Sequence, residues 1–127
     1  MIAFRAGHPV VHRRRFFTGD TNQRGLPDII WHGCQLHAPG WSDPTSSVLA
    51  FTLGGSGETN DVHVMLNMSV HNLDFDLPPV APRRWHRAVD TALPCPHDIA
   101  SPGDEIDVKP NDRYCVNARS VVVLISQ

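Results

Sequence analysis

Apolar and polar residues alternate along the middle of the chain with the period of two that is typical of β-strands. Residues 62–68 predict one strand, whose apolar side is expected to face a core and consists of Val62, Val64, Leu66 and Met68. Residues 73–77 predict a second strand, with Leu73, Phe75 and Leu77 on one face. Pro78 ends it, because proline cannot donate to a strand ladder. The two strands are predicted to pair as a β-hairpin.

Six further segments have the composition of short strands and are separated by turn residues. They are residues 28–31, 47–53, 84–89, 106–108, 113–116 and 120–125. Segment 84–89 is predicted to place Trp85, Arg87 and Val89 on one face. Segment 120–125 is apolar on both faces, which indicates a central strand. Residues 54–57 are glycine-rich but lack the Lys-Ser or Lys-Thr of a phosphate-binding loop, so they are interpreted as a hairpin loop.

The pattern gives about seven or eight strands and no helix after residue 10. It therefore predicts an all-β fold, an antiparallel β-sandwich preceded by a short N-terminal helical segment. His8 and Pro9 should end that helix. A helix of one or two turns is not stable alone. The sequence thus predicts that the N-terminal segment is the end of a preceding domain, with the chemistry of the protein lying upstream.

Composition narrows the class of protein. A chain of 127 residues suggests one domain, and 41% apolar with 19% charged residues indicates a folded core. The net charge of −2 gives no electrostatic basis for binding nucleic acid or an anionic membrane, and no segment approaches the length of a membrane span. Three cysteines without motif spacing favour reduced thiols in a cytoplasmic protein, although one disulfide remains open.

Candidate chemistry is sparse. Most of the 13 acidic residues lie in turns or on outward strand faces, and no pair is placed as a glycosidase requires. His32, Cys34 and His37 include a Cys-x-x-His spacing, but zinc normally needs a second such pair and none follows. The sequence therefore predicts no cofactor and no metal. Trp31 and Trp41 flank a polar loop, where they serve either as an aromatic platform or as buried anchors.

Several segments, taken in order, resemble the C-terminal part of bacterial isoamylase-type glycogen debranching enzymes, members of the α-amylase superfamily of glycoside hydrolases. The strongest are Asp-Ile-Ile-Trp at 28–31 and Ala-Arg-Ser-Val at 118–121. The remaining segments are residues 2–5, 8–10, 13–17, 19, 32–33, 39–43, 49–53, 66–67, 75–78, 84–85, 90–91 and 122–124. The resemblance covers nearly the whole chain. It implies that residues 1–17 are the remnant of the last barrel helix and its connector, and that residues 18–127 form the C-terminal β-sandwich domain.

The resemblance implies a parent enzyme that hydrolyses α-1,6 branch linkages in glycogen-like α-glucans. No position here matches the catalytic motifs of that enzyme, so no catalytic residue is assigned. The leading hypothesis is a non-catalytic accessory domain that stabilises the catalytic barrel. Apolar residues without an obvious partner inside a lone sandwich are expected to form the barrel interface: Ile2, Phe4, Val10, Val11, Phe16 and Phe17. An exposed patch of this kind also provides a surface for homodimer formation.

Two alternatives remain. In the first, the sandwich is a binding module that holds α-glucan through Trp31 and Trp41, which requires that the two rings stand exposed and roughly coplanar. In the second, the chain is a small enzyme that uses a metal bound by the histidine-rich segment 32–37.

Overall fold

A computed structural model describes all residues from Met1 to Gln127. Two short helical elements are followed by eight strands, as the sequence predicted. The elements are α1 (Ile2–Gly7), η1 (Pro9–Val11, a 3₁₀ turn), β1 (Ile30–His32), β2 (Val48–Leu53), β3 (Val62–Asn67), β4 (Leu73–Asp76), β5 (Trp85–Asp90), β6 (Ile106–Asp107), β7 (Arg113–Val116) and β8 (Ser120–Ser126). Neither helical element is long or apolar enough to cross a membrane.

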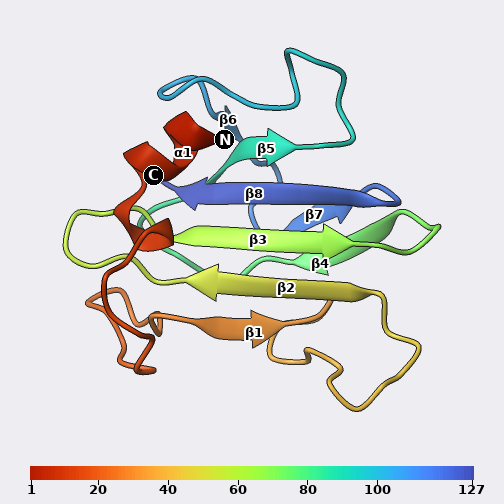
Figure 1. The fold of residues 1–127 in the computed structure, drawn as a ribbon, viewed down its shortest axis with the longest axis horizontal. Coiled ribbons are helices and arrows are strands. Elements are labelled where there is room, and N and C mark those ends of the chain that lie inside the picture. Colours follow the sequence, from red (N-terminus) through yellow and green to blue (C-terminus); the bar gives the residue numbers. More distant parts are fainter.

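The strands form two antiparallel sheets (Figure 1). The larger sheet has six strands in the order β1-β2-β3-β8-β5-β6, and the smaller consists of β4 and β7. In the view of Figure 1 the smaller sheet lies behind the larger one, and α1 lies in front of it. Strand β8 has neighbours on both sides in the large sheet, which confirms the prediction that residues 120–125 form a central strand.

The main core lies between the two sheets. Trp85 and Phe75 are fully buried there, together with Met65, Val116 and Leu124. The indole N–H of Trp85 donates to the carbonyl of Pro78 at 2.7 Å, so the polar atom of this large side chain is satisfied inside the core. The predicted apolar face of residues 73–77 is confirmed, because its three members all pack in this cluster.

The predicted hairpin between residues 62–68 and 73–77 is wrong, because β3 belongs to the large sheet and β4 to the small one. The crossing between the sheets is fixed by the fully buried Asn67. Its side-chain amide donates to the carbonyls of His71 and Val116 at 2.8 and 3.0 Å. These bonds hold the segment that follows β3 against β7, and β4 therefore pairs with β7.

The face of β3 that points into the main core was also assigned wrongly. His63, Met65 and Asn67 lie on the inner side and are fully buried, whereas Val62 and Val64 belong to a second apolar cluster on the other side of the sheet. In β5 a shift of register between Arg87 and Val89 also changes the predicted face. Trp85 points into the main core and Val89 to the opposite side, because a bulge reverses the alternation.

Candidate functional site

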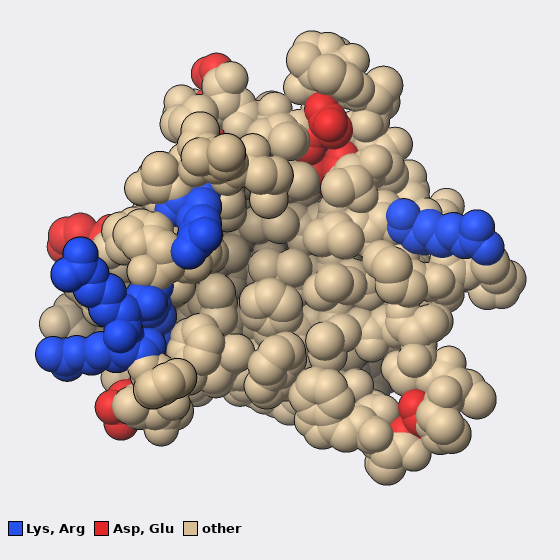
Figure 2. Space-filling view, in the orientation of Figure 1, with Lys and Arg blue, Asp and Glu red and all other residues tan.

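The outer face of the large sheet, turned away from β4 and β7, is made of apolar side chains. The strand register aligns them in three rows: Trp31, Phe51, Val64 and Val123; Leu49, Leu66 and Val121; Leu53, Val62 and Ile125. Figure 2 views this side of the molecule and shows no charged side chain at its centre. An antiparallel sheet that faces water on one side normally alternates apolar and polar residues. This outer face departs from that alternation, since its side chains are apolar across β2, β3 and β8.

The N-terminal segment covers only one end of the outer face. Val10 of η1 is 6% exposed and packs with Leu53, Val62 and Ile125, and Phe4 and Val11 lie partly buried beside it. The ring of Phe4 stacks on His8 at 4.2 Å between centroids. Val10 thus has a partner within the domain, which the sequence did not reveal.

Three of the predicted interface residues are exposed. Ile2 is 89% and Phe16 95% exposed, and Phe17 is 45% exposed beneath the guanidinium of Arg13. Phe16 and Phe17 line a groove together with Phe51, Leu53 and Val64, so they extend the apolar surface of the outer face. Five of the predicted interface residues therefore form one candidate site with the outer face, namely Phe4, Val10, Val11, Phe16 and Phe17, whereas Ile2 lines neither this groove nor the apolar cluster.

Trp31 lies on β1, an edge strand of the large sheet, and Trp41 contacts it. Trp41 is 67% and Trp31 39% exposed, with ring centroids 5.5 Å apart and an angle of 70° between the planes. They form an edge-to-face pair, so the coplanar platform expected of a sugar-stacking site is not present. Trp31 also contacts Phe51 at 5.3 Å between centroids. This contact joins the tryptophan pair to the outer face.

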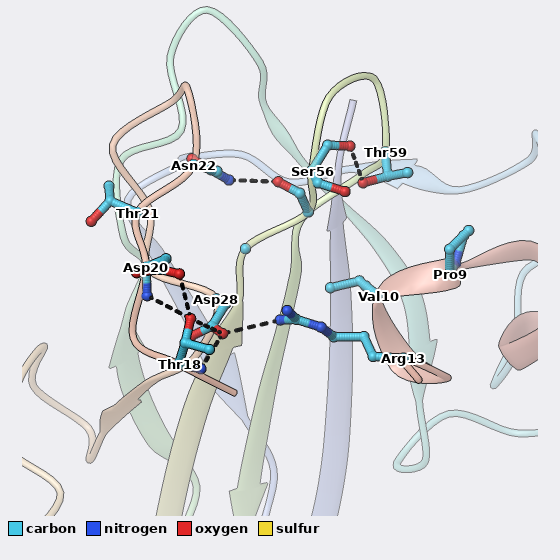
Figure 3. A pocket seen from close by; sticks show the side chains of 12 residues that line it. Pro9, Val10, Arg13, Thr18, Asp20, Thr21, Asn22, Asp28, Ser56 and Thr59 are labelled. Atoms are coloured by element: carbon cyan, nitrogen blue, oxygen red, sulfur yellow. Dashed lines mark hydrogen bonds and ion pairs between the residues drawn. The ribbon is translucent and has the colours of Figure 1, made fainter. Parts of the chain in front are cut away.

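A polar pocket of about 250 Å³ separates the connector after η1 from the loop that follows β2 (Figure 3). The Asp28 carboxylate accepts backbone hydrogen bonds from Thr18 and Gly19 at 2.7 and 2.9 Å and forms an ion pair with Arg13 at 3.4 Å. Burial alone would raise the pKa of Asp28, but these partners lower it below its ordinary value. The Asp28 carboxylate thus has its partners within the chain, and these contacts hold the connector against the sandwich.

The histidine-rich segment does not present metal ligands. His32 is buried, and its Nδ1 accepts the backbone N–H of His37 at 2.9 Å while its Nε2 lies 3.1 Å from the Thr52 hydroxyl. Burial raises the pKa of the Cys34 thiol, which makes it a weak nucleophile. No cluster of three or more His, Cys, Asp or Glu side chains forms in the structure, and all three cysteines are free.

Comparison with known proteins gives a consistent result. Residues 30–123 match the family model described as "Isoamylase 1-3, C-terminal". The chain is 31% identical over 105 residues to isoamylase 3, chloroplastic, of Oryza sativa subsp. japonica, which covers 81% of the chain and 12% of that relative. It is 29% identical over 121 residues to isoamylase 2, chloroplastic, of Arabidopsis thaliana, which covers 84% of the chain and 13% of the relative. The chain therefore spans only 12–13% of the length of these relatives.

Proposed function

The chain belongs to the family of isoamylase C-terminal domains, and we propose on this premise that it is the accessory domain of a glycogen debranching enzyme. The chain contains no catalytic domain. In this proposal the catalytic barrel hydrolyses α-1,6 branch linkages in glycogen-like α-glucans, and the present domain stabilises that barrel by packing against it. The names of the relatives support the isoamylase part of the proposal.

The apolar outer face is the observation that supports docking of the domain onto the barrel. Its three rows of apolar side chains are covered by the N-terminal segment at one end only, and the centre bears no charge. Burying apolar surface contributes about 25 cal/mol per Å², so a face of this kind supplies a strong driving force for association with a complementary apolar surface. The exposed Phe16 and Phe17 extend the same surface.

A charge placed at the uncovered end of the outer face should weaken docking. Leu66 lies between Leu49 and Val121 in the row farthest from the one that Val10 covers, and it is half-buried. Leu66→Lys is expected to weaken binding to an isoamylase that lacks its own C-terminal domain by a factor of at least about ten, because an unpaired ammonium would be buried at the contact. Binding can be followed by surface plasmon resonance.

Asp74→Lys is the matched control, since Asp74 is exposed on β4 in the smaller sheet, behind the large sheet. We expect it to bind like the unchanged domain. If Leu66→Lys and Asp74→Lys bind equally well, the outer face is not the docking surface. Alternatively, the same surface forms a homodimer. Sedimentation velocity at rising concentration would then detect a dimer of the unchanged domain that Leu66→Lys disrupts.

Binding of α-glucan by Trp31 and Trp41 remains a second candidate, which the 67% exposure of Trp41 favours. If it is correct, glycogen in a native gel should retard the domain, and Trp41→Ala should restore most of the lost mobility because the exposed ring is removed. Phe16→Ala is the control, as it removes another exposed ring that is not part of the tryptophan pair. Equal mobility with and without glycogen would exclude this function. The edge-to-face geometry and the contact of Trp31 with Phe51 favour docking over sugar binding.

A further inference from the structure

A groove of about 440 Å³ runs between the N-terminal segment and the large sheet. Its floor consists of Phe51 and Leu53 of β2 and Val64 of β3, and its walls include Phe16 and Phe17. Phe51 and Val64 are only half-buried, and Phe16 is almost fully exposed. The groove can therefore take a bulky apolar side chain and remove both its surface and the floor from water.

The rim of the groove is positively charged. Arg5, Arg13 and Arg15 line it, and no Asp or Glu does. Arg13 is paired with Asp28 at 3.4 Å, whereas Arg5 and Arg15 make no ion pair within the chain. Figure 2 shows a cluster of Lys and Arg side chains on the left, on the side where α1 and η1 lie in Figure 1. The chain as a whole has a net charge of −2, so the sign of the charge is reversed at this groove.

We propose that the groove binds a protein segment in which carboxylates flank one bulky apolar side chain, and that this segment belongs to the catalytic part of the enzyme. The inference rests on the proposed docking function and adds the chemistry of the partner. An arginine guanidinium binds a carboxylate through two parallel hydrogen bonds, which fixes the orientation of the segment as well as its charge. A neutral sugar would leave Arg5 and Arg15 without a charged partner, and an anionic polymer would leave the apolar floor uncovered.

Synthetic peptides added to the intact 127-residue chain test the chemistry of the groove. The probe is an acidic peptide with a single phenylalanine between pairs of glutamates, and the two matched controls replace either the glutamates by lysines or the phenylalanine by serine. We expect the probe to bind at least about tenfold more tightly than either control and to weaken as salt is raised. NMR shifts of the Val64 methyls locate the site. Three results would each overturn the proposal. The first is that millimolar probe causes no shift of the Val64 methyl signals, and the second is that the three peptides bind with equal affinity. The third is that a sulfated polysaccharide competes for the groove as well as the acidic peptide does.

Charge reversal at the rim tests the role of the arginines. The double variant Arg5→Glu/Arg15→Glu is expected to lose at least about tenfold in affinity for the acidic probe and to gain affinity for the lysine peptide. Arg14→Glu is the matched control, because Arg14 is exposed in the same segment but does not line the groove. Both side chains changed in the double variant are at the surface, and circular dichroism verifies that it is folded.

The same variants separate failure of this inference from failure of the proposed function. In the docking assay with the isoamylase that lacks its own C-terminal domain, Arg5→Glu/Arg15→Glu should weaken binding while Arg14→Glu should not. If Leu66→Lys abolishes docking but the double arginine variant binds normally, the domain docks through the outer face and the groove inference is wrong. If neither variant changes docking, the proposed function itself is wrong.

Discussion

Replacing Arg24 with leucine is expected to lower the free energy of unfolding by about 3–5 kcal/mol. Arg24 forms a bidentate ion pair with Asp61, with Nε–Oδ2 and Nη2–Oδ1 distances of 2.9 and 2.8 Å. The Asp61 carboxylate is fully buried and also accepts hydrogen bonds from the Gly55 N–H and the Ser126 hydroxyl. Burial alone would raise the pKa of Asp61, but Arg24 and these other donors lower it. Without Arg24, a buried negative charge would lose its counter-ion.

The same guanidinium ties two loops together, which adds to the expected loss. It donates to the carbonyls of Gly55, Gly57 and Thr59, all in the loop between β2 and β3. The measurement is urea unfolding at pH 7, followed by tryptophan fluorescence. Arg84→Leu is the matched control: Arg84 pairs with Asp107 at 3.1 Å, but both side chains are substantially exposed, so its loss should cost no more than about 1 kcal/mol.

A double variant distinguishes the charge from the packing. Arg24→Leu/Asp61→Asn should be more stable than Arg24→Leu alone, because the buried charge is gone, the amide oxygen can still accept the Gly55 N–H, and the amide nitrogen can donate to the Ser126 hydroxyl. If Arg24→Leu costs no more than Arg84→Leu, the buried pair does not hold the loops in place.

Most of the fold could be predicted from the sequence because the strands are short and bounded by strong turn residues. The eight strands and the central position of β8 follow from local pattern alone, and so does the end of α1 at Gly7, before His8-Pro9. The glycine-rich residues 54–57 open the loop between the antiparallel strands β2 and β3, in agreement with the prediction. The resemblance to isoamylase C-terminal regions, built from ordered weak segments, is confirmed by the family match over residues 30–123.

The inward face of β3 could not be predicted, because polar side chains occupy it. The inner side of β3 carries His63 and Asn67, both of which a period-two pattern assigns to solvent. They are buried because the Thr52 hydroxyl and the carbonyl of Val116 in β7 supply hydrogen-bond partners that lie far away in the sequence. Since Val62 and Val64 were assigned to the core, the outer face itself was missed.

The candidate site was predicted in part. The N-terminal apolar residues were recognised as lacking partners, which the structure shows for Ile2 and Phe16 but not for Val10. A signal for the larger surface was present: β8 is apolar on both sides, and only one side can face the small sheet. Trp31 and Trp41 were treated as an isolated pair, and only the strand register reveals that Trp31 shares a row with Phe51 and Val64. Whether these residues contact a barrel stays a prediction.

The second large effect expected is a loss of stability on mild acidification, caused by a buried chain of hydrogen bonds between two histidines. His32 Nδ1 accepts the His37 backbone N–H, so the proton of the neutral His32 ring lies on Nε2, which donates to Thr52 Oγ1 at 3.1 Å. The Thr52 hydroxyl then donates to His63 Nδ1 at 2.8 Å. In this arrangement the proton of His63 is on Nε2, which is buried without a partner, and both rings are neutral.

Neutrality of the two rings has a direct consequence for pH dependence. Burial, followed by the influence of the other ring, lowers the pKa of His63 to about 3, and burial followed by the nearby His37 lowers the pKa of His32 to about 4. In the unfolded chain both titrate near the ordinary value of about 6.5. Between about pH 6.5 and pH 4 the unfolded state thus binds more protons than the folded state, so stability falls as the pH falls. Each histidine contributes a slope of about 1.4 kcal/mol per pH unit, and the loss between pH 7 and pH 5 should total about 3–4 kcal/mol.

This pH window separates the histidines from the carboxylates. Asp61 and Asp28, whose pKa values are lowered in the folded state, remain ionised in both states above about pH 5 and lose their contribution only in stronger acid. Urea unfolding at pH 7, 6 and 5 measures the slope. His63→Leu should halve it because one of the two groups no longer titrates, whereas the exposed His97→Gln should leave it unchanged. A stability that stays constant between pH 7 and pH 5, or an unchanged slope in His63→Leu, would show that the two rings can be charged inside the fold. The hydrogen-bond directions derived for His32, Thr52 and His63 would then be wrong.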